Sequence, residues 1–169
     1  MRGHRNPDFD AAMMPLLDEA FDFAARLTRD DQAAEELTQE AFARAFESFA
    51  RFTPGTSPRA WLFTILRNLF FNLERGRRRH ALVPLEDAPE PSREPKETAD
   101  ATPALDRAIA ALPVKLREAV VLDLQGLTCK EIGAIAHCPP GTVMSRLFRA
   151  RQLLRAQLEA AGLVRGGEG

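Results

Sequence analysis

The residues best suited to chemistry are arginines on one stretch near the C-terminal end of the chain. At about 100° per residue, a helix here buries one apolar stripe, made of Val143, Leu147, Ala150 and Leu154. Its other sides carry Ser145, Phe148, Arg149 and Gln152, flanked by Met144, Arg146, Arg151 and Arg155. No acid occurs between Thr142 and Arg155. Because arginine can hold a phosphate or grip a guanine edge with two hydrogen bonds, this face suits DNA. The alternative is a solvated basic helix that packs on a partner protein.

A second set of candidate binding residues lies in the middle of the chain. An expected helix over 58–77 places an aromatic ring, a hydroxyl and two amides in one line: Trp61, Thr64, Asn68 and Asn72. Phe52 lies in the turn before it, and a basic tail follows, with Arg75, Arg77, Arg78 and Arg79. Rings stack on bases, amides pair with base edges and arginines hold phosphates, so the set suits an unpaired strand. The same side chains could instead pack a third bundle helix, and the residues alone leave both open.

A third candidate surface is acidic. It lies on an expected helix over 32–49, from which Glu36, Gln39, Glu40 and Glu47 point outward. The residues alone favour a merely solvated face, although such a face would also suit a basic protein partner.

Catalytic motifs do not occur. The chain has no Gly-rich phosphate loop, no GxSxG and no HExxH, and His4, His80 and His137 are scattered. Cys129 and Cys138 lie at opposite ends of one expected helix, about 13 Å apart, too far for a disulfide. Together with one adjacent histidine they make a poor metal site. We therefore predict a protein that is not an enzyme and uses no cofactor, metal or small-molecule substrate.

The elements that must position these residues are all helices. Helices are expected over about 9–27, with Pro15 as a possible interruption, and over 32–49, 58–77, 104–111 and 113–124. Thr128 and Glu131 have the spacing of a capping box and begin the next helix. His137-Cys138-Pro139-Pro140 ends that helix, and Pro140 suits the first turn of the arginine-rich one. The sequence thus predicts an all-α fold that ends in a helix-turn-helix.

Composition divides the chain into two small domains. Five prolines occur among acids from Pro84 to Pro103, so we predict a flexible linker over 81–102 between domains over 1–80 and 103–169. The net charge of −1 hides segregation, since residues 8–40 carry ten acids and residues 44–79 carry eight arginines. A basic patch is typical of nucleic-acid binding even in a neutral chain. No apolar run is long enough to cross a bilayer and no signal peptide is recognisable, so a cytoplasmic location is expected.

Over about residues 21–158 the chain resembles bacterial sigma factors of the extracytoplasmic-function (ECF) group. The resemblance rests on three runs, in the order and spacing of that group: LTRDDQAAEELTQEAFARAF, RFTPGTSPRAWLFTILRNLFFN and ALPVKLREAVVLDLQGLTCKEIGAIAHCPPGTVMSRLFRARQLLR. It implies a two-domain initiation subunit that joins core RNA polymerase and directs it to promoter DNA. Members of the group commonly bind an anti-sigma factor, so such a partner is also expected.

The resemblance also implies roles for the three surfaces. Residues matching the −35 reader in the major groove are Thr142, Met144, Ser145, Arg146, Phe148, Arg149 and Arg151, with Met144 replacing the basic or polar residue of many relatives. Those matching the −10 module, where the duplex melts and a base is flipped out, are Phe52, Trp61, Asn68, Asn72, Arg75, Arg77 and Arg78. Those matching the polymerase-binding surface are Glu36, Gln39 and Glu40.

Two other functions remain possible for the chain. A stand-alone helix-turn-helix regulator would need a sensor or dimerisation domain at its N-terminus, where this chain has an aromatic and amide face. A sigma-like decoy that only binds an anti-sigma factor would not need the arginines at 146, 149 and 151.

Overall fold

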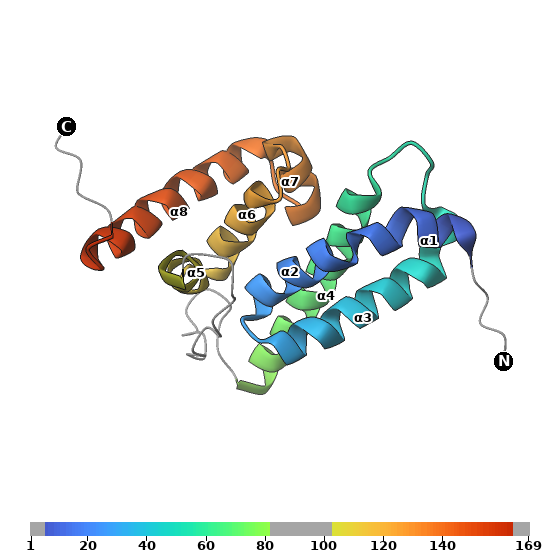
Figure 1. Ribbon diagram of the computed structural model, residues 1–169, viewed down its shortest axis with the longest axis horizontal. Helices are drawn as coiled ribbons and strands as arrows, with labels where there is room; N and C mark the ends of the chain where they lie inside the picture. Colours follow the sequence, from blue (N-terminus) through green and yellow to red (C-terminus); the bar gives the residue numbers. More distant parts are fainter. Residues whose placement is uncertain (1–5, 82–102, 164–169) are drawn as a thin grey trace. The chain divides into compact units, whose positions relative to one another are not determined.

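The structure is a computed structural model, and it describes residues 6–81 and 103–163. The chain divides into two compact units, Met1–Ser92 and Arg93–Gly169. All regular structure in the described residues is helical, which confirms the predicted all-α fold of two helical domains (Figure 1). The predicted linker lies outside the described residues, except for Ala81, the last residue of its helix.

Over residues 6–81, the first unit contains four α-helices and two short 3-10 turns. They are α1 (Pro7–Met13), η1 (Met14–Leu16), α2 (Leu17–Thr28), α3 (Asp31–Ser48), η2 (Phe49–Arg51) and α4 (Pro58–Ala81). The helix expected over 9–27 is divided at Pro15, where the sequence allowed for an interruption, because Pro15 lies in the 3-10 turn between α1 and α2. The turn also changes which side chains face inward, so Leu17 is 41% exposed while Phe23 is buried.

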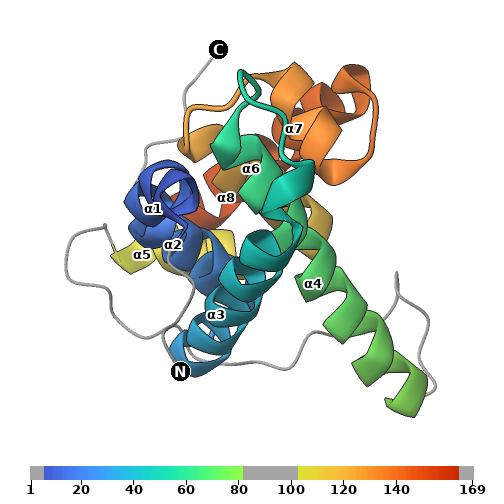
Figure 2. The same cartoon turned by 90° about the vertical axis from the view of Figure 1, so that its right-hand side faces the viewer.

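The core of the first unit lies between α2, α3 and α4. Phe23 of α2 packs on Phe63 of α4 with ring centroids 5.1 Å apart. Three leucines on one side of α4 are buried, Leu62, Leu66 and Leu69. Four further residues on other sides of that helix are buried as well: Phe63, Arg67, Phe70 and Phe71. Figure 2 shows the end of α4 extending beyond α2 and α3, and its last turns are therefore largely exposed.

The second unit consists of α5 (Pro103–Ala110), α6 (Val114–Leu124), α7 (Cys129–Ala136) and α8 (Pro140–Ala160). The predicted capping box is present, with Thr128 accepting from the Glu131 amide and Glu131 accepting from the Thr128 amide. Gly126 closes α6 at a φ of 80°, which glycine adopts without strain. The helix-turn-helix of α7 and α8 is therefore formed as the sequence predicts.

One buried charge in the second unit has a structural role that the sequence did not indicate. Arg117 of α6 is only 1% exposed, and its Nη1 donates to the carbonyl oxygens of Leu112 at 3.0 Å and Ala110 at 3.4 Å. These carbonyls lie at the end of α5, where a helix leaves acceptors without partners of its own. Arg117 thus ties α5 to α6 beneath the helix-turn-helix.

Candidate nucleic-acid interface

The helix-turn-helix holds α8 by a close approach of two backbones. At Gly133 of α7, an added Cβ would lie 2.6 Å from the carbonyl oxygen of Cys138 in the turn. His137 supplies the left-handed closing residue of α7, and the Cys138 amide donates to the Gly133 carbonyl at 3.0 Å. The start of α8 is therefore fixed against α7 within one tight turn.

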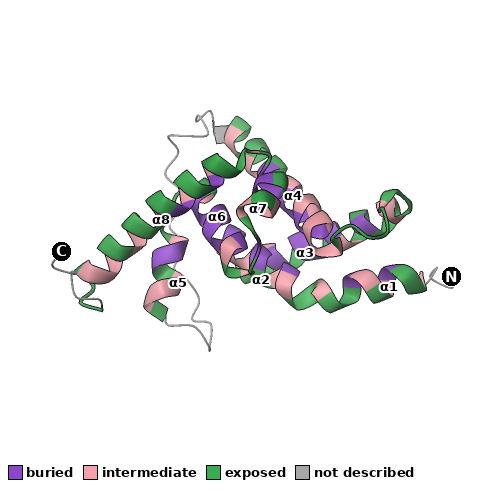
Figure 3. Ribbon diagram, turned by 90° about the horizontal axis from the view of Figure 1, so that it is seen from above, coloured by how far each residue is buried: buried purple, intermediate pink, exposed green. Residues whose placement is uncertain are grey.

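The outer face of α8 is open to solvent. Val143, Leu147 and Ala150 are buried as predicted, whereas Leu154 is only half-buried. Figure 3 shows this division along α8, with exposed residues covering its outer side. Of the predicted −35 residues, five are exposed, namely Met144 (62%), Ser145, Phe148 (65%), Arg149 and Arg151, and two are half-buried, Thr142 and Arg146.

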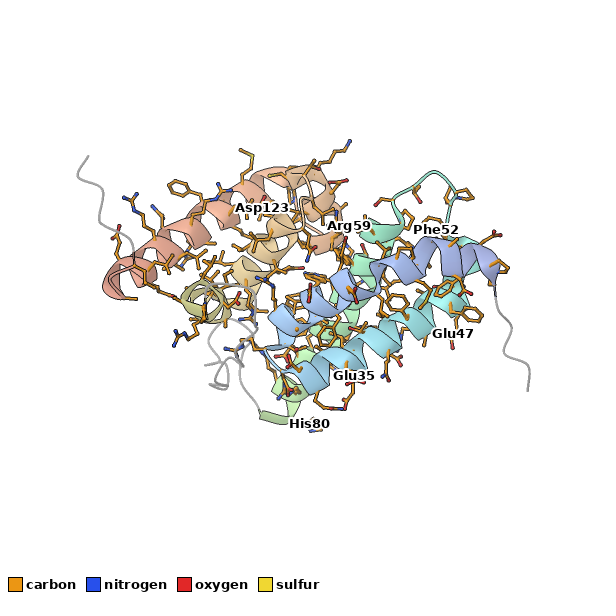
Figure 4. The ribbon with its side chains drawn as sticks, in the orientation of Figure 1. Glu35, Glu47, Phe52, Arg59, His80 and Asp123 are labelled. Atoms are coloured by element: carbon orange, nitrogen blue, oxygen red, sulfur yellow. The ribbon has the colours of Figure 1, made fainter. Side chains whose placement is uncertain are left out.

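The arginines on this face differ in what holds them. Arg146 donates from Nη1 to the Cys138 sulfur at 3.6 Å, and Arg151 lies 3.6 Å from a carboxylate oxygen of Asp123 on α6. Figure 4 labels Asp123, the acid that sequence reasoning missed because it comes from another helix. Within residues 6–81 and 103–163, no hydrogen bond or ion pair engages Arg149. Arg149 is therefore the arginine most available to a ligand.

We predict that Asp123→Asn strengthens binding to promoter DNA. The Arg151–Asp123 pair is exposed, at 69% and 39%, so it contributes little to stability. Removing the carboxylate frees Arg151 for a phosphate and removes a repulsive charge, which should raise affinity by up to about 1 kcal/mol. Equilibrium binding of duplex promoter DNA at two salt concentrations tests this, and unchanged or weaker binding would contradict it.

An aromatic cluster packs around Phe52, at the start of the turn before α4. We give this name to Phe9, Phe46, Phe49, Phe52 and Trp61. Within it, Phe52 lies 5.3 Å from Trp61 and stacks on Phe49 at 5.6 Å with an interplanar angle of 12°. Phe52 and Trp61 are each half-exposed, so each is packed and still offers part of its surface. The two predictions for Trp61, packing and stacking on a base, are therefore compatible in one residue.

The other predicted −10 residues follow the same helix. Asn68 is half-buried and Asn72 is exposed, while Arg75 and Arg77 are exposed and Arg78 is half-buried. Arg77 pairs with Glu74 at 3.1 Å. At 1.5 Å per residue, Arg78 lies about 25 Å along α4 from Trp61. These residues therefore do not form one pocket, and their arrangement fits a track for several nucleotides.

The predicted polymerase-binding residues lie on one helix. Glu36, Gln39 and Glu40 of α3 are all exposed, and Figure 4 labels Glu35 and Glu47 near the two ends of the same helix. Gln32 donates to Glu36 at 3.0 Å, Gln39 to Glu35 at 3.4 Å, and Arg44 to Glu40 at 2.8 Å. Three carboxylates with one arginine leave this face acidic.

Within residues 6–81 and 103–163, no group of three or more His, Cys, Asp or Glu side chains is arranged to hold a metal ion. Over the same residues, no helix has the length and apolar character that crossing a membrane requires.

The two units match two known protein families. The Sigma-70 region 2 family matches residues 13–80, and the Sigma-70 region 4 family matches residues 103–154. Both describe parts of RNA polymerase sigma factors, which are DNA-binding initiation factors and not enzymes.

Individual relatives narrow the class. The chain is 40% identical to ECF RNA polymerase sigma factor SigE of Mycolicibacterium smegmatis, over 90% of this chain and 62% of that protein. It is 38% identical to ECF RNA polymerase sigma factor EcfG of Rhodopseudomonas palustris, over 83% of this chain and 79% of that protein. The solved structure of the sigma factor RpoE in complex with the anti-sigma factor NepR from Bartonella quintana matches with a TM-score of 0.76 and 31% identity, over 91% of this chain and 98% of that one. The chain belongs to the ECF family of RNA polymerase sigma factors.

Proposed function

We propose that this protein binds core RNA polymerase and directs initiation at promoters whose −35 element is read as duplex and whose −10 element is captured as an open strand. The exposed face of α8, on which no hydrogen bond or ion pair from residues 6–81 and 103–163 engages Arg149, is the observation that carries the proposal. An arginine so placed can reach a base edge without first breaking an ion pair. The aromatic cluster and the track along α4 support the −10 role, and the acidic face of α3 supports the polymerase contact.

Transcription in vitro tests the whole proposal at once. Core RNA polymerase, the purified chain and a pool of genomic fragments should yield discrete start sites that core enzyme alone does not produce. Aligning the fragments then gives the −35 and −10 sequences for the later experiments. Start sites that are the same with and without the chain would reject the proposal.

An anti-sigma partner is part of the proposal. The Bartonella relative was solved in complex with NepR, an anti-sigma factor. A regulator of that kind acts where the polymerase acts, so we also place this protein in the cytoplasm. A decoy that only binds such a regulator has no need of the open arginine face of α8, and transcription from the fragment pool separates the two functions.

We predict that Asn68→Ala slows promoter melting more than it weakens initial binding. Asn68 lies on α4 seven residues beyond Trp61, and an asparagine amide can pair with the edge of an unstacked base. Permanganate reactivity of −10 thymines should fall, while binding of closed duplex at low temperature stays near wild type. Because Asn68 is half-buried, thermal unfolding of the variant is the control. Wild-type permanganate footprints would exclude the role.

A further inference from the structure

The helix α1 contributes one ring, that of Phe9, to the aromatic cluster. α1 begins before the match to sigma-70 region 2, which starts at residue 13. Its residue Phe9 is 5% exposed and meets Phe46 at 5.2 Å and Phe49 at 5.4 Å, with interplanar angles of 87° and 88°. Edge-to-face contacts of this kind stabilise a ring pair beyond simple burial. Phe9 therefore holds Phe49 from the side of α1.

Phe49 is also the support of the turn that follows it. Phe52 stacks on Phe49, and the Phe52 amide donates to the Phe49 carbonyl at 2.9 Å. The next five residues, 53–57, are all exposed, and Gly55 adopts a φ of 91°. Phe52 is thus the residue through which this turn packs on the rest of the unit. Rings then follow one another from Phe9 through Phe49 and Phe52 to Trp61.

We propose that Phe9 is a positioning residue for capture of the unpaired −10 base. It fixes Phe49, and through Phe49 it fixes Phe52 and Trp61 in the arrangement that receives the base. Removing the Phe9 ring leaves a space that its neighbours fill only in part, so Phe49 gains freedom. A binding site gains affinity when its rings are held in place before the ligand arrives. The inference rests on the proposed −10 role.

A comparison of two DNA ligands tests the inference in assembled holoenzyme. The ligands are forked promoter DNAs with a single-stranded non-template −10 element, one intact and one with an abasic site in place of the captured base. In the wild type, loss of that base should weaken binding about 5- to 150-fold, the range expected for base stacking on aromatic side chains. We call this factor, the affinity for the intact DNA divided by that for the abasic DNA, the abasic penalty. In Phe9→Ala the abasic penalty should fall below about threefold, because the rings no longer receive the base well.

Comparing penalties rather than affinities separates positioning from stability. A variant that merely folds less well loses affinity for both ligands equally, so its abasic penalty stays at the wild-type value. Met13→Ala is the matched control, since Met13 is fully buried on the same helix and lies outside the aromatic cluster. It should keep the wild-type penalty. If Phe9→Ala fails to fold, Phe9→Leu carries the same test, because leucine keeps apolar volume and lacks the ring edge.

Three results would overturn the assignment. A wild-type penalty in Phe9→Ala would remove Phe9 from positioning and leave −10 capture intact. If the abasic penalty fell as far in Met13→Ala as in Phe9→Ala, the effect would belong to the packing of α1 as a whole. Absence of any penalty in the wild type, at every −10 position, would reject base capture itself and the role of Phe9 with it.

Discussion

Arg149→Ala should weaken binding of duplex −35 DNA by about 1–3 kcal/mol, the usual cost of losing one bidentate contact to a base. Arg149 is exposed on α8, and no hydrogen bond or ion pair among the described residues competes for it. The variant leaves the buried side of α8 untouched, so folding should not change. Binding to core polymerase should also stay at the wild-type level, because the acidic face proposed for that contact lies on α3. Titration of a labelled −35 duplex measures the loss.

Arg155→Ala is the matched control for this prediction. It removes the same charge from the same helix, but Arg155 pairs with Glu159 at 2.9 Å and lies outside the predicted −35 residues. It should lower affinity only through weaker general attraction to phosphates. In addition, Arg149→Ala should reduce discrimination at one base pair, whereas Arg155→Ala should leave discrimination unchanged. Equal affinity of Arg149→Ala and wild type would remove Arg149 from base reading.

Gly133→Ala should destabilise the second unit by about 1–3 kcal/mol, as overpacking of a tight contact does. An added Cβ would lie 2.6 Å from a backbone oxygen, that of Cys138, so the turn itself must move. Moving the turn shifts the start of α8, and −35 affinity should fall together with stability. Urea unfolding followed by circular dichroism, with hydrogen exchange at the amides of α7 and α8, measures the effect.

Gly141→Ala provides the contrast. Gly141 lies in the first turns of α8, and an added Cβ there meets nothing within 4 Å. Because alanine favours a helix over glycine, this change should be neutral or stabilise by up to about 1 kcal/mol. If Gly133→Ala unfolded at the same urea concentration as wild type, the close approach of the two backbones would not be a constraint on sequence.

The features that the sequence predicted correctly are those that depend on neighbouring residues. The capping box at Thr128 and Glu131 joins positions three apart, and the turn before α8 follows from two prolines. Such contacts are encoded locally, so spacing alone identifies them. Exposure of Arg149 also followed from helical periodicity, because the buried stripe of α8 lies on its other side.

The features that were missed depend on partners distant in the sequence. Asp123 reaches Arg151 from another helix, and Phe9 reaches Phe49 across forty positions. Periodicity describes one helix at a time and says nothing about which helix faces which. Helical spacing over 9–27 would also place Leu17 on the inward side, but Leu17 is 41% exposed, since a 3-10 turn at Pro15 changes the direction of the side chains that follow. The functional roles of the individual site residues remain predictions.

The position of Trp61 has a practical consequence. The chain contains one tryptophan and no tyrosine, so its near-ultraviolet emission comes almost entirely from an indole in contact with Phe52. Fluorescence of the free chain therefore reports on the first unit alone and is blind to melting of the second. A nucleobase that stacks on this indole should quench it, which makes the unlabelled protein an optical sensor of its own strand capture.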